Sequence, residues 1–559
     1  MNVLGILGAF YWDANERAFY WDANETEKWV HDAGASLFLN GNHICSISEE
    51  RLSKVKYDGN YPAKAISYCL DAGNILPKDI DLVCVASICI DDFYQQLNSK
   101  IIHKKLQDTF INARIEIVGH HKSHAASAIF SSPFKQGTFL TMDGAGSWHL
   151  NYDEKWESTE TSSLGYFDKS KNIFRSFPNF DCGQWQTVTN HYWNAAHRTY
   201  NLKTNQNINI FDPKHREAFC GKIMGLSAYG SWKGYDWKRY KVLNHDTLPT
   251  LLFDNSYDYI EWDVSPDDMA AITQKNTEEG VLELVTELRR EYLDEYTCFA
   301  GGFFLNILVN TRIKNSGLFK DIYIPPFPSD CGLHFGAACY GLFKHNESIT
   351  LPANVALLGK EYLEEEILEE IKDLKYKKYD DFIQLCKDTS QLLYENKIIG
   401  WFQGRSEHGP RALGSRSILM NPSKKEHKDI INERIKHREY WRPFAGIILD
   451  EHLRDYFEDN IDNPYMIYSQ TVRPEKKSKL AAIIHEDNTC RIQTVNSEMN
   501  DKVTCLLNEY HSLSGTPVLL NTSFNDNGQP IVETPKDAVQ TFINLDIDYL
   551  VIGNYLVEK

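Results

Sequence analysis

The sequence predicts a mixed α/β protein built from two domains. With 559 residues, the chain is too long for one ordinary hydrophobic core. Its 42% hydrophobic and 13% aromatic residues can fill substantial cores, which excludes a disordered chain. Short β-like runs alternate with helical periodicity over residues 1–345, and the same mixture returns in the last 200 residues.

In the first domain, short apolar runs predict strands, and apolar residues at helical spacing predict helices. The strands are expected at 1–7, 35–39, 81–87, 115–119, 138–142, 297–301 and 321–324. The helices are expected at 62–72, 124–131, 281–296 and 304–317. Pro352 lies just before an acidic helical segment at 361–372, so the two domains are expected to span 1–352 and 353–559.

The second domain repeats the mixed pattern. A strand is expected at 398–402, an exposed charged helix at 424–436, and short strands at 517–520 and 549–552. Thr534 followed by Pro535 is typical of a helix N-cap with proline at the first helical position.

The composition restricts the classes of partner. The chain has 59 basic and 77 acidic residues, a formal charge of −18, which opposes binding to long nucleic acids. Its 12 cysteines are scattered without a Cys-x-x-Cys pair, so we expect buried thiols in a reducing compartment. The sequence shows neither a secretion signal nor an apolar run long enough to span a membrane, so a cytoplasmic location is expected. A dimer is the statistical expectation for its assembly.

Residues 404–416 are the most informative segment. They interleave Arg405, Arg411 and Arg416 with glycines, and a second basic run follows at 436–444. The guanidinium fork matches phosphate oxygens two at a time, and glycine lets the backbone approach a ligand closely. In an acidic chain, these loops predict a site for a small, highly anionic substrate; the alternative is a solvated loop with surface ion pairs.

Two histidines and two aspartates predict a metal site in the first domain. His120 and His124 are spaced to share one side of a helix. Asp143 ends a predicted strand, and Asp330 precedes a helix of small residues. This mixed set of nitrogen and oxygen donors suits iron, manganese or zinc rather than calcium. His121 is expected to support the ligands or to pack in the core.

Three further features of this domain have two interpretations each. Gly301-Gly302, between a strand and a helix, offers N–H groups to a phosphate, although tight turns also use such pairs. His31 could act as a general base or be structural. Residues 9–16 recur as 18–25, which predicts either a surface hairpin or an aromatic lid over an acceptor.

Together these motifs resemble the O-carbamoyltransferases, typified by nodulation protein U and by antibiotic-tailoring enzymes such as the tobramycin carbamoyltransferase. The matching motifs follow the family order over nearly the whole chain: His31-Asp32, Glu49-Glu50-Arg51, 120–124, 142–144, 300–302, 329–332, 404–416, 438–444 and 521–525. The resemblance implies an N-terminal domain with the actin/Hsp70/sugar-kinase fold and a YrdC-like C-terminal domain. The duplication at 9–25 departs from the family pattern, so the acceptor is not implied.

The resemblance also implies an activity and a set of site residues. The C-terminal domain would make carbamoyl adenylate from carbamoyl phosphate and ATP with Mg²⁺, and the N-terminal domain would pass the carbamoyl group to a hydroxyl of a natural product or sugar. The implied ligands of a metal, Fe²⁺ in this family, are His120, His124, Asp143 and Asp330. The implied carbamoyl phosphate contacts are Arg411, Arg416, Lys436, Arg442, Arg491 and Ser523. The nucleotide contacts would be Gly144, Gly301, Gly302 and Asn306, and the catalytic residues His31, Lys436 and Arg442.

Two alternatives stay open. A threonylcarbamoyl-type enzyme that modifies tRNA has relatives of both domains, but the negative charge and the lack of a Lys/Arg-rich stripe argue against RNA binding. A nucleotide-dependent binding module would use the N-terminal fold without chemistry, and would leave the arginine-rich motifs without a role.

Overall fold

The protein consists of two compact units. The computed structural model describes residues 1–8, 11–13, 18–20, 31–87, 106–144, 148–150, 156–181, 188–208, 218–235, 238, 240–243, 250–253 and 264–559. The first unit comprises Met1–Ser53 and Tyr57–Leu351, and the second comprises Lys54–Lys56 and Pro352–Lys559. Both units mix helices with sheets, which confirms the predicted α/β class.

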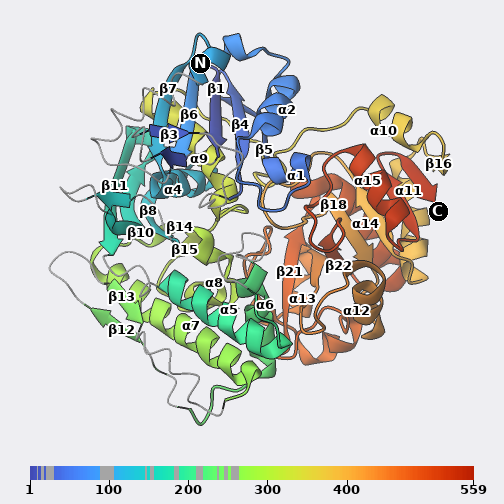
Figure 1. Cartoon of the computed structure of the whole chain (residues 1–559). Coiled ribbons are helices and arrows are strands. Elements are labelled where there is room, and N and C mark those ends of the chain that lie inside the picture. Colours follow the sequence, from blue (N-terminus) through green and yellow to red (C-terminus); the bar gives the residue numbers. More distant parts are fainter. Residues whose placement is uncertain are drawn as a thin grey trace. The chain divides into compact units, whose positions relative to one another are not determined.

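The first sheet of the N-terminal unit surrounds a fully buried central strand. Its order is β5 (Asn42–Ser48), β4 (Gly34–Leu39), β1 (Val3–Leu7), β6 (Leu82–Ser87) and β7 (Arg114–Gly119). β4 runs antiparallel to β1, and β6 and β7 run parallel to it. Helix α2 (Ala63–Gly73) packs on β4 and β5, and α9 (Leu333–Lys344) packs on β1 (Figure 1). Because β1 is covered on both faces, its sequence is apolar throughout.

The second sheet repeats this arrangement. Its order is β11 (Ile173–Asp181), β10 (Trp156–Asp168), β8 (Gln136–Met142), β14 (Tyr296–Ala300) and β15 (Asp321–Tyr323), and β9 (Trp148–Leu150) pairs with β10. In both sheets the first strand is central, the next two are antiparallel on one side, and the last two are parallel on the other. This doubled order is that of the actin/Hsp70/sugar-kinase fold, as the sequence predicted.

Two helices lie between these sheets. Helix α4 (His120–Ser131) packs mainly on β8 and β14 of the second sheet, and against α9 of the first. Their contact is close, since a Cβ added to Gly336 would lie 1.9 Å from the backbone oxygen of Ser123. A further short helix, α1 (Glu49–Ser53), follows β5.

The remaining helices of this unit correct two predicted boundaries. They are α5 (Val188–Thr204), α6 (Ala218–Leu226), α7 (Pro266–Glu291) and α8 (Ile307–Asn315), beside the hairpin β12 (Tyr240–Leu243) and β13 (Thr250–Phe253) (Figure 1). The predicted helix 281–296 is in fact the second half of α7, whose polar first half hides its periodicity. The predicted helix 304–317 is split at Asn306, which caps α8 by accepting the N–H of Val309 at 3.2 Å.

The duplicated segment is described only in part. β2 (Tyr11–Asp13) and β3 (Ala18–Tyr20) pair antiparallel, as a hairpin requires. Trp21, the rest of 9–25 and the side chains of Tyr11, Trp12 and Tyr20 lie outside the described residues.

The C-terminal unit is built on one sheet. Its order is β16 (Lys375–Lys378), β24 (Tyr555–Glu558), β23 (Tyr549–Ile552), β17 (Ile399–Phe402), β18 (Arg416–Met420), β22 (Val518–Ser523), β19 (Ala445–Leu449), β21 (Thr489–Val495) and β20 (Gln470–Thr471). The predicted strands at 398–402, 517–520 and 549–552 correspond to β17, β22 and β23.

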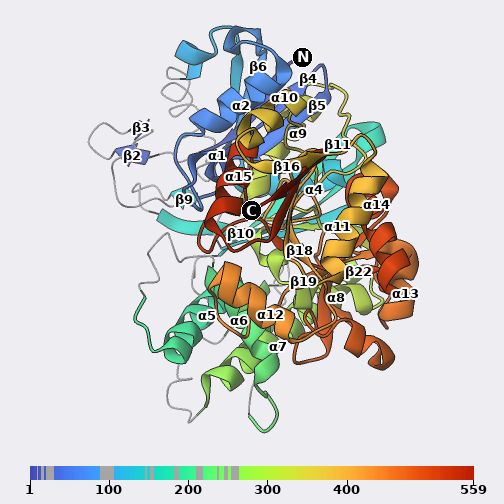
Figure 2. The ribbon, with the colours of Figure 1, turned by 90° about the vertical axis from the view of Figure 1, so that its right-hand side faces the viewer.

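Helices cover both faces of this sheet. Helices α11 (Phe382–Tyr394) and α14 (Ser497–Ser514) pack together on one face (Figure 2). Helices α10 (Glu364–Ile371), α12 (Glu426–Ile431) and α15 (Pro535–Asn544) share the core of the other face, and the short α13 (Leu453–Tyr456) adds to it. Successive strand residues alternate between the cores, with Leu519 on the α14 side and Leu520 on the α15 side.

The structure tests two helix predictions for this unit, the N-cap at Thr534 and the exposed helix at 424–436. Thr534 is confirmed as an N-cap, since its hydroxyl accepts the N–H of Asp537 at 3.1 Å. The helix predicted at 424–436 is confirmed over 426–436, where α12 continues into a π-turn at Asn432–Lys436, but its predicted exposure is wrong, because Ile431, Ile435 and Lys436 are buried. Apolar residues at helical spacing give the segment a core-facing side that its many charges concealed.

The cysteines of the described ranges are mostly buried thiols. Eight of the ten cysteines there are buried, and no disulfide joins any of these ten. Among the helices described, none is long and apolar enough to span a bilayer.

Candidate functional site

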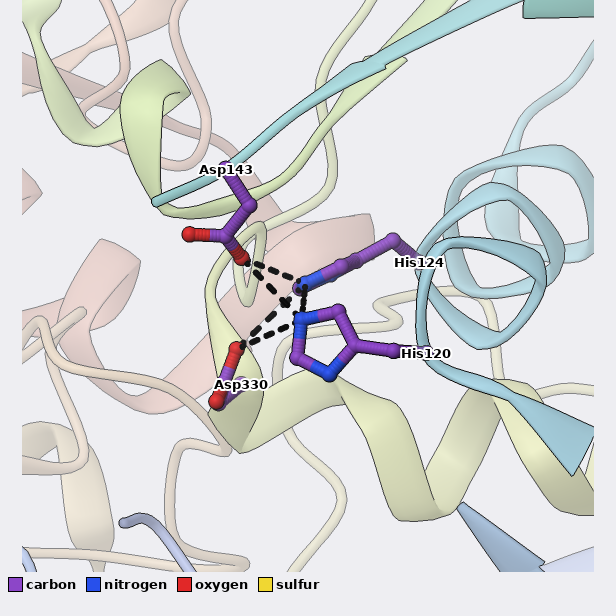
Figure 3. A group of neighbouring side chains, drawn as sticks. All are labelled: His120, His124, Asp143 and Asp330. Atoms are coloured by element: carbon purple, nitrogen blue, oxygen red, sulfur yellow. Dashed lines mark hydrogen bonds and ion pairs between the residues drawn. The ribbon is translucent and has the colours of Figure 1, made fainter. Parts of the chain in front are cut away.

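The N-terminal unit brings the four predicted metal ligands together. His120 and His124 lie one turn apart at the start of α4, which begins directly after β7 ends at Gly119. Asp143 follows β8, and Asp330 begins the short turn before α9. Figure 3 shows the two imidazoles from one helix facing the two carboxylates. One potential ligand atom from each of the four residues lies within 4.8 Å of those from the other three.

The distances in this cluster fit a bound cation. The Nε2 atoms of His120 and His124 are 3.2 Å apart, and both lie 3.4–3.5 Å from Oδ1 of Asp330. Oδ2 of Asp143 is 3.4 Å from His120 Nε2 and 2.8 Å from His124 Nε2. Ligands placed about 2.1 Å from one ion are separated by roughly 3.0–3.4 Å in octahedral or tetrahedral geometry. The residues therefore fit a divalent transition metal with little rearrangement.

The charges in the cluster are mutually stabilising. Burial alone lowers the pKa of His124, but its hydrogen bonds to Asp143 and Asp330 outweigh burial and raise the pKa to about 9. Burial would likewise raise the pKa of Asp143, yet contacts with both histidines hold it well below its usual value. The two carboxylates thus stay ionised, as metal coordination requires.

His31 lies at the edge of this cluster. Its Nδ1 is 3.2 Å from Oδ2 of Asp32, and its Nε2 is 3.8 Å from Oδ2 of Asp330. Its side chain is 28% exposed, whereas the ring of His124 is fully buried. A histidine ring oriented by a carboxylate through one nitrogen is suited to take a proton at the other.

The predicted glycines border the same cluster. Gly301 follows β14 with φ of +103°, and a Cβ added there would lie 2.0 Å from the backbone oxygen of Met142. A Cβ added to Gly302 would lie 3.2 Å from Oδ1 of Asp143. This oxygen also accepts the N–H of Gly144 at 2.6 Å. Because β8 and β14 are adjacent and parallel, their carboxyl ends bring these glycines beside Asp143.

Two residues near the cluster have other contacts. Asn306 caps α8, and its amide also pairs with that of Gln274 at 3.2 Å in both directions. His121 bonds to Thr141 Oγ1 at 2.8 Å and to the Glu160 carbonyl at 3.2 Å, and burial lowers its pKa to about 4. The nucleotide contact expected of Asn306 stays a prediction.

In the C-terminal unit, the predicted anion-binding residues gather at one edge of the sheet. β18 begins at Arg416, and its neighbour β22 ends at Ser523. β19 begins at Ala445, just after Arg442, and Ala445 pairs with Arg491 on β21. Because β22 runs antiparallel to its two neighbours, its end and their beginnings meet at this edge.

Two of the three arginines in 404–416 bind the backbone. Arg405 donates to the carbonyls of Gly359 at 2.6 Å and Leu358 at 3.2 Å. Arg416 is fully buried, with its guanidinium 3.6 Å from the Phe402 ring centre. It donates to the carbonyls of Gln403, Gly404 and Ser415 at 2.9–3.2 Å. These contacts give both residues a role in shaping the loop, and the substrate contact expected of Arg416 stays a prediction.

The third arginine belongs to a cluster of like charges. Burial is the main cause that holds the pKa of Arg491 well below its usual value, and the charges of Arg411, Arg438 and Arg442 add to it. Burial and Arg442 also lower the pKa of Arg438. Because arginine keeps its proton in proteins, these lowered pKa values reflect buried, mutually repelling charges that a bound anion would stabilise. Nε of Arg491 is buried without a hydrogen-bond partner in the described part of the chain.

Lys436 is held beside this cluster. It ends the π-turn after α12, and its Nζ lies 2.6 Å from the carbonyl of Ser523 and 2.7 Å from Oδ1 of Asn525. The Ser523 hydroxyl and the Asn525 carbonyl are 3.3 and 2.9 Å away. These acceptors favour the ammonium form. Burial, with the charges of Arg438 and Arg442, opposes it and holds the pKa of Lys436 well below 10.5.

The lowered pKa of Lys436 predicts pH-dependent anion binding. An anion favours the ammonium form, so affinity is full below the lowered pKa and falls by up to about tenfold per pH unit above it. We expect the Kd of carbamoyl phosphate, measured by calorimetry between pH 6.5 and 9.5, to rise with pH. Lys436→Arg keeps its charge over this range, so its Kd should rise less. Identical pH profiles for the two proteins would contradict the prediction.

Sequence reasoning missed two residues of this site. Arg438 lies in the basic run 436–444 but was given no separate role, although it stacks 4.3 Å from the Phe444 ring centre within the arginine cluster. Glu407 lies between Arg405 and Arg411 and is 1% exposed. A single carboxylate among arginines was the available signal for it.

Comparison with known proteins identifies relatives of both units. The family described as carbamoyltransferase N-terminus matches residues 26–108 and 86–339, and carbamoyltransferase C-terminus matches 390–559. Nodulation protein NolNO of Sinorhizobium fredii is 30% identical over 576 residues, covering 95% of this chain and 79% of that protein. Protein sll1178 of Synechocystis, which is uncharacterised, is 29% identical over 95% of both chains. Nodulation protein U of Rhizobium tropici is 37% identical over 42% of this chain and 39% of its own.

Similarity to solved structures is more remote. HypF of T. kodakarensis aligns over 62% of this chain and 48% of its own, with 12% identity and a TM-score of 0.36. At this level the similarity does not bear on substrates or on the roles of residues.

Proposed function

We propose, from the premise that this chain belongs to the carbamoyltransferase family, that it is an ATP-dependent O-carbamoyltransferase acting on a small-molecule hydroxyl. The observation that carries the proposal is the basic edge of the C-terminal sheet, where Arg491 pairs with Ala445, just after Arg442, and where Nε of Arg491 is buried without a hydrogen-bond partner among the described residues. Such a basic edge is stabilised by a compact, highly charged anion, and carbamoyl phosphate and ATP are both of this kind.

The C-terminal unit would carry out activation. Carbamoyl phosphate, ATP and one water balance as carbamoyl adenylate, phosphate and pyrophosphate. Arg411, Arg442 and Arg491 would bind the phosphoryl oxygens, each charge-assisted bond contributing about 1.5–3 kcal/mol. Lys436 would hold Ser523 at the same edge of the sheet, because its Nζ contacts that residue's carbonyl and hydroxyl. Mg²⁺ would accompany the ATP phosphates.

The N-terminal unit would carry out transfer. The acceptor hydroxyl would attack the carbamoyl carbon, AMP would leave, and Nε2 of His31 would take the hydroxyl proton. Asp32, 3.2 Å from Nδ1 of His31, orients the ring for this role. The N–H groups around Gly301 and Gly302, at the end of β14, would receive the adenylate phosphate.

His120, His124, Asp143 and Asp330 would hold a divalent cation beside this site. Their separations and donor types fit a transition metal, and the family resemblance indicates Fe²⁺. When bound, the cation would polarise the carbamoyl carbonyl as a Lewis acid.

Pyrophosphate release tests the activation step. The purified chain with ATP and Mg²⁺ should release pyrophosphate only when carbamoyl phosphate is added, before any acceptor is known. Replacing carbamoyl phosphate with threonine and bicarbonate should give none, which separates this activity from threonylcarbamoyl chemistry. Release that is independent of carbamoyl phosphate, or driven by threonine and bicarbonate, would overturn the proposal.

A further inference from the structure

Glu407 closes the loop between β17 and β18 into a ring. Its Oε1 accepts three backbone N–H groups, from Leu413 at 2.6 Å, Ser415 at 2.8 Å and Arg416 at 3.1 Å. One oxygen of one side chain therefore fixes the returning part of the loop, six to nine residues further along the chain.

The ring is anchored on the rest of the C-terminal unit as well. The indole of Trp401 and the amide of Gln493 donate to the carbonyls of Gly414 and Leu413, both at 3.0 Å. Gly414 has φ of +92°, a conformation that glycine adopts readily. The ring is thus a defined structure rather than a flexible glycine loop.

Arg411 lies within this ring, between Glu407 and Leu413. It is half-buried, and its charge is close enough to Arg491 to lower the pKa of that residue. Like charges brought together in a partly buried site repel each other. The N–H groups of Leu413 and Ser415, which Glu407 accepts, lie two and four residues after Arg411, so these bonds restrict where the loop can place Arg411.

The buried position of Glu407 has an energetic cost. Its Oε2 is buried and makes no hydrogen bond to any residue in the described ranges. Burying a carboxylate with one oxygen unsatisfied is unfavourable, and a smaller or apolar residue would avoid it. The compensation visible in the structure is the set of three N–H bonds that close the ring.

We propose that Glu407 is a positioning residue that fixes the loop carrying Arg411 at the basic edge of the sheet, and so sets the affinity for carbamoyl phosphate. This inference rests on the proposed function of the C-terminal unit. Glu407 acts through the length of its side chain, which places Oε1 within hydrogen-bonding distance of the loop, and we call this its reach. Its negative charge alone would weaken anion binding.

Three substitutions separate reach from charge. Glu407→Ala removes the acceptor, and Glu407→Asp keeps the charge but shortens the side chain by one methylene. Glu407→Gln keeps an acceptor oxygen at the same reach without the charge. Asp548→Ala is the matched control, because Oδ2 of Asp548 accepts the N–H of Ile398 at 2.7 Å in the same sheet, outside the arginine cluster.

The experiment measures the Kd of inorganic phosphate for the full chain by calorimetry, with melting temperatures as a check on folding. The KM of carbamoyl phosphate and of ATP in pyrophosphate release gives a second measurement. We expect Glu407→Ala and Glu407→Asp to bind phosphate about tenfold more weakly or worse. Glu407→Gln should bind phosphate as tightly as the wild type or more tightly, and Asp548→Ala should be unchanged. The KM of carbamoyl phosphate should follow the same order, more strongly than that of ATP.

Two results would overturn the inference. Phosphate binding by folded Glu407→Asp and Glu407→Ala at wild-type affinity would show that Arg411 needs no anchor. Weak binding by Glu407→Gln with normal binding by Glu407→Asp would show that charge, not reach, is what matters. A wild-type chain that binds no phosphate would instead overturn the anion site of the proposed function, and the role of Glu407 with it. If Glu407→Ala does not fold, the Asp and Gln variants still decide between reach and charge.

Discussion

Replacing His124 by alanine is expected to abolish carbamoyl transfer while pyrophosphate release from ATP and carbamoyl phosphate continues. The side chain is fully buried and touches both carboxylates of the cluster, at 2.8 Å from Asp143 and 3.4 Å from Asp330. Its loss removes one of the four proposed ligands and leaves the two buried carboxylates with less positive charge between them. Since metal assistance is worth several kcal/mol in such reactions, the transfer rate should fall by about a thousandfold or more.

The measurement combines three properties of the purified protein. Metal content by mass spectrometry should fall in His124→Ala, and the retained pyrophosphate release reports that the C-terminal unit is folded. His31→Ala is the comparison variant: it keeps all four ligands, so it should retain metal yet lose transfer to the acceptor. Full transfer by His124→Ala with normal metal content would contradict the role of the cluster. Full transfer by His31→Ala would remove only His31 from the reaction.

The second large effect is expected at Arg491. Its Nε is buried without a partner in the part of the chain that the structure describes, and three further arginines lie around it. If the guanidinium makes two charge-assisted bonds to the substrate, its removal costs about 3–6 kcal/mol. Arg491→Ala should then lower kcat/KM for carbamoyl phosphate in pyrophosphate release by at least about a hundredfold.

Two variants make this result specific. Arg491→Lys keeps the charge but offers no planar pair of donors, so it should restore only part of the activity. Arg473→Ala is the control, because Arg473 is a surface residue whose Nε donates to the Arg454 carbonyl at 2.9 Å. A kcat/KM for Arg491→Ala that matches that of the Arg473→Ala control would place the substrate phosphate elsewhere.

The residues brought together in the N-terminal unit could be named from the sequence because local spacing determined them. His120 and His124 are one helical turn apart, and Asp143 follows an apolar strand, so the backbone alone limits where their side chains can point. Asp330 required more, since nothing in the local sequence places the start of α9 beside the start of α4. Its assignment depended on its place before a predicted helix of small residues, and the family resemblance supported it.

The roles of the arginines could not be read in the same way. Arg405, Arg411 and Arg416 look equivalent in the sequence, yet Arg416 donates to three carbonyls, whereas the charge of Arg411 contributes to the lowered pKa of Arg491. Which carbonyls a side chain meets depends on how a loop returns to its sheet, and residue type does not specify that path. The length of α7 was missed for a related reason: its first half buries polar residues such as Thr273 and Asn276, and hydrophobic periodicity does not detect these.

The packing of α4 and α9 has a mechanical consequence for the N-terminal unit. Helix α4, with His120 and His124, begins directly after β7 of the first sheet and packs on β8 and β14 of the second, whereas Asp143 follows β8 and Asp330 precedes α9, which packs on the first sheet. An ion bound by all four residues would link elements of the first sheet to elements of the second. Metal binding and the separation of the two sheets would then be thermodynamically coupled. Any change that moves the sheets apart would weaken metal binding by the same free energy.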